Sequence, residues 1–157
     1  MRHRIYLDNC CYNRPYDDQT QIRIQLETEA KLYIQKLIIE NSVELVISYV
    51  LDYENSKNRT LRKRQAIADF MSINESFYVG AERETEILKI AGPVIRTGVK
   101  EKDALHVACS IYAGCDYFIT TDDRLLKYQP EQVWLYVVFG GELVYCLLTL
   151  DGLDHEI

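Results

Sequence analysis

The chain has 157 residues, of which 48% are hydrophobic and 27% are charged, a balance typical of a globular protein and not of a disordered one. Its formal net charge of −6 argues against broad non-specific binding of nucleic acid, but it allows an acidic metal site with a local basic rim. From the length we expect one domain over residues 1–157. Without a long apolar run or signal-peptide pattern, we expect a cytoplasmic protein with no membrane partner.

Strand-like and helix-like segments alternate along the chain. Runs rich in β-branched and aromatic residues predict strands at 4–8, 43–48, 76–80, 116–120 and 132–139. Apolar and capping patterns predict helices at 18–40, after Ser48, at 58–73, 82–97 and 102–114, and from Asp122 to Leu126. Residues 9–18 are expected to form a loop, with Asp17 or Asp18 as the next N-cap. The alternation predicts an α/β fold with a mostly parallel sheet of about five strands and helices on both faces.

Four carboxylates fall where such a sheet would bring them to one edge. Asp8 closes the first strand, and Asp122 follows the fourth. Glu54 lies in the helix that leaves the second strand, and Asp103 begins the helix that leads into the fourth. Because ligands of open parallel sheets bind outside the carboxyl ends of the strands, we expect the four side chains to converge.

Converged carboxylates repel one another, and a hard divalent cation such as Mg²⁺ or Mn²⁺ relieves this repulsion with oxygen ligands. Such an ion can activate water and stabilise a phosphoryl transition state, so the pattern indicates metal-assisted phosphodiester hydrolysis. Each acid also has a structural explanation. Asp8 could end a strand, Glu54 could be solvated, Asp103 could favour a helix dipole, and Asp122 could be an N-cap. Their joint placement favours a site.

The segments around these acids resemble the PIN domain, a fold of small metal-dependent ribonucleases that includes VapC-type toxins of bacterial toxin–antitoxin pairs. The matching segments are "IYLDNC", "SYVLDYE", "KDALHVACSIYAGCDYFIT" and "TTDDRLL". The resemblance runs from the first strand to about Tyr128. It implies a PIN-like three-layer α/β/α sandwich in which Asp8, Glu54, Asp103 and Asp122 are the catalytic, metal-binding carboxylates.

The resemblance also implies supporting roles beside the acids. Thr120 matches a small hydroxyl residue that forms hydrogen bonds within the site, and Asn9 is a candidate polar partner of Asp8. Asp123 adjoins the last acid, although we expect its side chain to point elsewhere. His106, one turn after Asp103, is expected to be packed or to support a ligand, and not to act as a base.

The sequence departs from the family pattern in two places. Many members have Ser, Thr or Asn two residues after the first Asp, where this chain has Cys10, so Asn9 or Asn13 would have to replace that polar partner. Many also have Asn-Pro after the final strand, where this chain has Phe139-Gly140-Gly141. The second departure concerns the C-terminal tail and leaves the acids unaffected.

Basic and aromatic residues near the acids suggest how an acidic protein could bind RNA. The candidates for RNA contact are Arg14, Arg59, Arg62 and Lys63, with Lys57 and Arg64 beside them. The same run could instead be a solvated helix face, and both interpretations stay open. Tyr12, Tyr16 and Tyr53 could stack on unpaired bases or could pack as core or rim residues.

The resemblance therefore predicts a Mg²⁺- or Mn²⁺-dependent ribonuclease, with a toxin role, a small antitoxin partner and a homodimer as further expectations. The alternative is a non-catalytic PIN-fold module that binds RNA or protein, in which one or more carboxylates would be lost. The sequence has no P-loop and no GxGxxG, and Cys10 stands where an aspartyl phosphatase needs a second Asp. The five cysteines lack CxxC spacing, which favours reduced thiols over a zinc site. The RNA target and the number of ions stay open.

Overall fold

A parallel five-stranded sheet forms the centre of the molecule. The computed structural model describes residues 2–128 and 136–139. The strand order is β3-β2-β1-β4-β5, and every neighbouring pair is parallel. The strands are β1 His3–Leu7, β2 Val43–Ser48, β3 Glu75–Val79, β4 Tyr117–Thr120 and β5 Tyr136–Phe139. The predicted α/β fold is confirmed; positions 132–135 of the last predicted strand lie outside the described residues.

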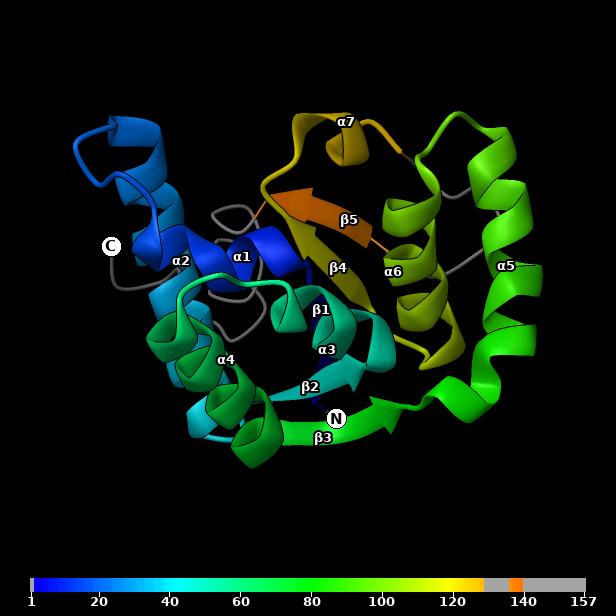
Figure 1. The fold of residues 1–157 in the computed structure, drawn as a ribbon, viewed down its shortest axis with the longest axis horizontal. Coiled ribbons are helices and arrows are strands. Elements are labelled where there is room, and N and C mark those ends of the chain that lie inside the picture. Colours follow the sequence, from blue (N-terminus) through cyan, green and yellow to red (C-terminus); the bar gives the residue numbers. More distant parts are fainter. Residues whose placement is uncertain (1, 129–135, 140–157) are drawn as a thin grey trace, which may run out of the picture.

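Helices cover both sides of this sheet (Figure 1). They are α1 Asn9–Asn13, α2 Ile22–Ile39, α3 Tyr49–Ser56, α4 Leu61–Asn74, α5 Glu84–Arg96, α6 Glu101–Tyr112 and α7 Asp123–Leu126, with 3₁₀ turns at Arg14–Tyr16 and Ala81–Arg83. In Figure 1, α5 and α6 lie together on the right of the strands, and α1, α2 and α4 lie on the left. Among the described helices, none has the length and apolar character needed to span a bilayer.

The core lies on both faces of the three central strands. These strands bury their apolar side chains almost completely, with exposed fractions of 0–1% for Ile5, Tyr6, Leu7, Leu45, Val46, Ile47, Phe118 and Ile119. Burial on both faces is expected of a parallel sheet covered by helices, and each such side chain contributes about 1.5–3 kcal/mol. The edge strand β3 differs, because its first four residues are exposed.

Local sequence signals explain several element boundaries. Ser48 is the N-cap of α3, as predicted, and its Oγ accepts the backbone N–H of Leu51 at 3.2 Å. The predicted break between α5 and α6 is confirmed at Gly98, whose φ of 100° favours glycine.

The segment after β1 is more helical than predicted. Instead of a loop it forms α1, whose N-cap is Asp8, followed by a 3₁₀ turn that contains Pro15. Neither Asp17 nor Asp18 caps α2, because Gln21 is the N-cap and Asp18 Oδ1 instead accepts the backbone N–H of Thr20 at 3.0 Å. The Asp18 side chain is therefore used for a hydrogen bond within the loop and does not cap α2.

The N-terminal half of α2 packs through polar side chains, contrary to the predicted apolar face. Ile22 and Leu26 are 74% and 57% exposed, whereas Glu27 and Thr28 are buried. The hydroxyl of Thr28 donates to the carbonyl of Arg14 at 3.2 Å, so this half of the helix docks on the 3₁₀ turn. Only the C-terminal half buries apolar residues, among them Ile34 and Ile38.

The order of the strands reverses direction at the carboxyl ends of β1 and β4. The chain runs outward from β1 through β2 to β3, then returns to pair β4 on the other side of β1. Such a reversal is where open α/β sheets bind ligands. The backbone N–H of Asp8 donates to the carbonyl of Ile119 at 2.9 Å, so the ends of both strands meet there.

Candidate metal site at the carboxyl edge of the sheet

Asp8 lies at the centre of this edge and is 6% exposed. Its Oδ1 accepts the backbone N–H of Asn9 at 2.8 Å, and its Oδ2 accepts the hydroxyl of Thr120 at 2.9 Å. The Thr120 oxygen in turn accepts the backbone N–H of Asp122 at 3.0 Å. The hydrogen bonding predicted for Thr120 is therefore present, and it links the first acid to the last.

Cys10 takes the polar position beside Asp8 that the sequence left open. Its Sγ lies 3.5 Å from Asp8 Oδ2 and 3.5 Å from Thr120 Oγ1, and it accepts the backbone N–H of Thr121 at 3.4 Å. Asn9 contributes its backbone N–H to Asp8, while the side-chain amide of Asn13 donates to the Asn9 carbonyl at 2.9 Å. The thiol, and neither asparagine side chain, is thus the neighbour of Asp8.

Glu54 reaches the edge from α3, and two cationic or polar groups from α6 bind it. Its side chain is 7% exposed, with Oε1 2.5 Å from His106 Nε2 and Oε2 3.5 Å from Lys102 Nζ. Burial alone would raise the pKa of Glu54. The hydrogen bond and charge of His106 and the charge of Lys102 together outweigh burial, so the pKa of Glu54 lies below its ordinary value. Glu54 is therefore ionised at neutral pH. His106 is buried and supports this acid, as the resemblance implied.

Asp103 lies in the first turn of α6 and is half-buried. Within the described residues its carboxylate accepts no hydrogen bond and has no cation at ion-pair distance. Burial raises the pKa of Asp103, and the charges of Asp8 and Asp122 and then of Glu54 raise it further, while His106 opposes them. Because charges interact mainly over short distances in a protein, the shift places Asp8, Asp122 and Glu54 within electrostatic range of Asp103, and a shared metal site stays a prediction.

Asp122 and Asp123 point in different directions. Asp122 is the N-cap of α7, and its Oδ1 accepts the backbone N–H of Arg124 at 2.8 Å. Asp123 is exposed and pairs with Arg23 at 2.7 Å, as expected for a side chain directed away from the acids.

Three of the four acids, Asp8, Glu54 and Asp122, are individually engaged by other groups. Among the residues that the structure describes, no three His, Cys, Asp or Glu side chains are already arranged to bind one metal ion. Asp8 and Asp122 cap helices, and Glu54 is turned toward His106. The donor set nevertheless fits a hard cation, since it consists of carboxylate oxygens and includes an Asp103 that forms no ion pair with any described residue.

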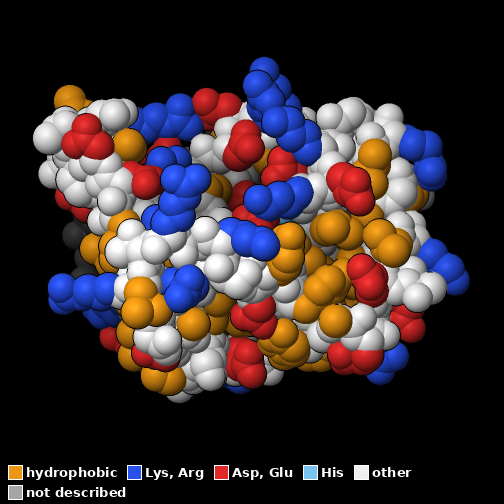
Figure 2. All heavy atoms as spheres, viewed as in Figure 1, with side chains coloured by type: hydrophobic (Ala, Val, Ile, Leu, Met, Phe, Trp, Pro, Cys, Tyr) orange, Lys and Arg blue, Asp and Glu red, His pale blue; other side chains and the backbone are white. Residues whose placement is uncertain are grey.

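The predicted basic residues divide into two groups. Arg14 is tied internally: its Nε lies 2.7 Å from Glu27 Oε2, and its Nη2 donates to Thr121 Oγ1 at 2.8 Å. Arg59 and Arg62 are exposed, and no carboxylate of the described residues pairs with them. Figure 2 shows acidic side chains near the middle of one face with Lys and Arg side chains beside them. The RNA contacts of all these residues stay a prediction.

Two exposed tyrosines carry a lysine over their rings. Lys63 Nζ lies 5.7 Å from the ring centre of Tyr16, and Lys57 Nζ lies 4.8 Å from that of Tyr53. Tyr16 and Tyr53 are 52% and 62% exposed, whereas Tyr12 is buried in the core and cannot stack on a base.

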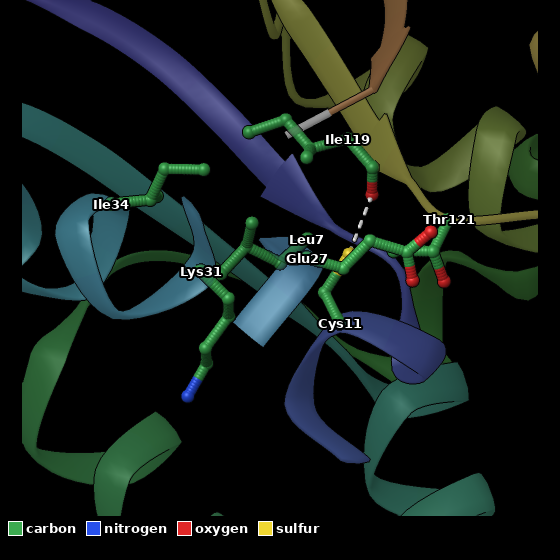
Figure 3. A pocket seen from close by; sticks show the side chains of 7 residues that line it. All are labelled: Leu7, Cys11, Glu27, Lys31, Ile34, Ile119 and Thr121. Carbon is green, nitrogen blue, oxygen red and sulfur yellow. Dashed lines mark hydrogen bonds between the residues drawn. The ribbon is translucent and has the colours of Figure 1, made fainter. Parts of the chain in front are cut away.

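Sequence reasoning missed a buried ionic network behind the site. The carboxylate of Glu27 is fully buried and pairs with both Arg14 and Arg23, at 2.7 Å each. Figure 3 shows a small pocket between α1, α2 and the strands, where the Glu27 carboxylate lies beside Thr121 and the amine of Lys31 points away. The network connects α2 to the segment that carries Asp122. A glutamate on a helix otherwise rich in polar residues gave no signal of this role.

The fold resembles that of a solved VapBC2 structure. No family model and no curated protein matches the sequence. Among solved structures, one described as VapBC2 from Rickettsia felis bound to a DNA fragment from their promoter matches with a TM-score of 0.54 and 13% identity. The match covers 85% of this chain and 98% of that chain. It confirms the predicted PIN-like α/β/α sandwich.

Proposed function

We propose that this protein is a divalent-metal-dependent ribonuclease and the toxin of a toxin–antitoxin pair. The observation that carries the proposal is Asp103, a half-buried carboxylate surrounded by the charges of three other acids and neutralised by no described residue. Enzymes commonly retain such unfavourable charge clusters because a ligand or substrate compensates them. Asp8, Glu54, Asp103 and Asp122 would bind Mg²⁺ or Mn²⁺.

The bound ion would activate water for attack on a phosphodiester and neutralise the charge that develops there. The protein's own residues orient the ligands for it. Thr120 and Cys10 fix the Asp8 carboxylate, and His106 fixes Glu54. Because Asp8 and Glu54 are nearly buried, they offer oxygen ligands in a place where few waters compete with them.

RNA would approach over α3, α4 and the 3₁₀ turn after α1. Arg59 and Arg62 are free to meet phosphates there, and the exposed rings of Tyr16 and Tyr53 offer stacking surfaces for unpaired bases. The lysines above those rings add positive charge at the same places. These groups would supply the local basic rim that the net charge of −6 does not.

An antitoxin and a second copy of the chain are the partners we propose. The structural neighbour is a VapBC2 assembly bound to promoter DNA, which supports an antitoxin partner for this chain. A small antitoxin would cover the acidic edge and suppress cleavage. Exposed apolar side chains of α2, such as Ile22 and Leu26, are consistent with a homodimer interface.

Cleavage of a total RNA pool by the purified chain tests the activity. We expect cleavage in Mn²⁺, none in EDTA, and a loss of at least about 100-fold in Asp103→Asn. Asp69→Asn is the matched control, because Asp69 is exposed on α4 and, within residues 2–128 and 136–139, its carboxylate accepts from Gln65 of the same helix alone. Equal cleavage by the wild type and Asp103→Asn would contradict the proposed site. A wild type with no Mn²⁺-dependent cleavage of any RNA would favour a non-catalytic module that binds RNA or protein.

A further inference from the structure

A buried hydrogen-bonded chain runs from the core of the sheet to Glu54. His106 Nε2 lies 2.5 Å from Glu54 Oε1, and His106 Nδ1 lies 2.6 Å from the hydroxyl of Tyr6. That hydroxyl lies 2.7 Å from Ser48 Oγ, which accepts the backbone N–H of Leu51. Ser48, Tyr6 and His106 are all 0% exposed.

The polarity of this chain follows from what each atom can do. An ionised Glu54 only accepts, so the Nε2 of His106 must carry a proton. A neutral imidazole then has a bare Nδ1, which needs a donor because it is buried, and Tyr6 supplies its phenolic proton. Ser48 can donate to the Tyr6 oxygen while it accepts from Leu51. In either protonation state Nε2 donates to Glu54, and in the neutral imidazole the tautomer of His106 is fixed by Tyr6.

Glu54 has more need of such support than the other acids. Asp8 and Asp122 follow strand ends and cap helices, which fixes their short side chains. Glu54 projects from within α3 on a longer side chain, and ordering it costs roughly 1.5–2 kcal/mol of rotamer freedom. A rigid buried donor removes most of this cost before any ligand arrives.

We propose that Tyr6 and His106 are positioning residues that fix one oxygen of Glu54 and present the other to the divalent cation. This role rests on the proposed function. The presented atom is Oε2, whose one ion-pair partner in the described part of the chain is Lys102, and Lys102 is 65% exposed and free to move aside. His106 and Tyr6 thus act through Glu54 and touch neither RNA nor metal.

A purely structural role for the same residues predicts a loss of stability and nothing else. The positioning role also predicts weaker binding of Mn²⁺ by folded protein. Tyr6→Phe removes the hydroxyl but keeps the ring that stacks on Phe118 with centres 5.4 Å apart. His106→Gln keeps an N–H toward Glu54, and His106→Leu removes it. Ser110→Ala is the control, since the Ser110 hydroxyl is buried on α6 and, among the residues with a described structure, bonds the Val107 carbonyl alone.

The test is titration of each full-length variant with Mn²⁺ in the absence of RNA, after thermal denaturation has shown that it folds. We expect His106→Leu to bind Mn²⁺ about 10–100-fold more weakly, Tyr6→Phe to be weakened several-fold, and His106→Gln and Ser110→Ala to stay near the wild type. If His106→Leu does not fold, Tyr6→Phe against Ser110→Ala decides. The ¹⁵N resonances of the imidazoles give a second readout, because the chain has three histidines and Tyr6→Phe should mix the tautomers of His106.

Two results would overturn the inference in different ways. Wild-type Mn²⁺ affinity in both Tyr6→Phe and His106→Leu would overturn the positioning role and leave the ribonuclease proposal intact. A wild type that binds no Mn²⁺ would overturn the proposed metal site itself, and the positioning role with it.

Discussion

Thr120 donates its hydroxyl proton to Oδ2 of Asp8 at 2.9 Å, a hydrogen bond between residues 112 positions apart in the chain. The Thr120 hydroxyl oxygen also accepts the backbone N–H of Asp122. One buried side chain therefore sets the relative position of the two acids at the carboxyl ends of β1 and β4, and its removal should affect both.

Thr120→Val should lower both stability and cleavage. The substitution keeps the shape of the side chain, but it removes the hydroxyl donor to Asp8 Oδ2 and the acceptor of the Asp122 N–H. We expect a loss of about 1–3 kcal/mol in the free energy of unfolding and a fall of about 10–100-fold in the rate of RNA cleavage. Thr120→Ser keeps the hydroxyl and should retain most of both. Urea denaturation and single-turnover cleavage measure the effects, and equal rates for the two variants would show that the hydroxyl is unimportant.

Asp103→Asn should stabilise the metal-free protein. The pKa of Asp103 is raised by burial and by neighbouring acids, so between its ordinary pKa and the raised one the native state binds more protons than the unfolded state. The free energy of unfolding then falls as pH rises through this window. At neutral pH the group is ionised and the native state is destabilised by the full amount. Removing the charge should raise the free energy of unfolding by roughly 0.5–2 kcal/mol in EDTA, and the gain should vanish below about pH 4.

Saturating Mn²⁺ should reverse that order. At 100 times its Kd, a ligand stabilises the native state by about 2.7 kcal/mol, and the wild type should gain this while Asp103→Asn gains much less. Thermal denaturation in EDTA and in Mn²⁺ measures the stability difference between the wild type and Asp103→Asn without and with metal, with Asp69→Asn as the control. A variant that gains as much from Mn²⁺ as the wild type would remove Asp103 from the metal site.

Glu27→Gln should destabilise the protein and loosen the segment around Asp122. The substitution leaves the guanidiniums of Arg14 and Arg23 without their shared buried carboxylate. Breaking a buried pair costs about 3–5 kcal/mol. Because Arg23 is 57% exposed, we expect a smaller loss of about 2–3 kcal/mol here. Urea denaturation checks this against Glu29→Gln, an exposed glutamate of the same helix. Identical midpoints for the two variants would mean that the network contributes nothing.

Arg59→Gln with Arg62→Gln should weaken RNA binding and its dependence on salt. Each lost phosphate contact lowers the slope of log K against log salt by about 0.7 for a single strand, so the double variant should lose about 1.4. Binding is measured in the Asp103→Asn background, which prevents cleavage. Arg96→Gln, an exposed arginine on α5, is the control. An unchanged slope would place RNA on another surface.

The sequence was informative where local pattern and tertiary role agree. Strand ends and helix starts predicted the positions of Asp8, Asp103 and Asp122. The parallel topology brings such backbone positions to one edge of the sheet, independently of the side chains. Asp122 shows that the two explanations can coexist, since it caps α7 and also belongs to the acidic cluster.

The sequence was uninformative where a residue's role depends on a distant partner. Glu27 reads as a surface residue of α2, yet it is buried because Arg14 and Arg23 neutralise it. The periodicity of α2 wrongly placed Ile22 and Leu26 in the core, because polar docking on the 3₁₀ turn decides which face of that half of the helix is buried. Such pairings appear only once the fold has brought the segments together.

Lys31 should make the protein more stable as pH rises into the alkaline range. Burial between Tyr12 and Phe70 lowers the pKa of this lysine to about 8, against about 10.4 in an unfolded chain. Between these values the unfolded state binds more protons, so the free energy of unfolding should increase with pH, by roughly 1–3 kcal/mol. Lys31→Met should abolish the increase, since it fills a similar space without a charge, and it should be more stable than the wild type at neutral pH. Lys36→Met, which removes an exposed lysine of the same helix, should keep the wild-type dependence. Urea denaturation across about pH 7 to 10 measures the difference between the variants, in which the titration of other groups cancels. A wild type that runs parallel to Lys31→Met over that range would show that Lys31 keeps its ordinary pKa in the folded protein.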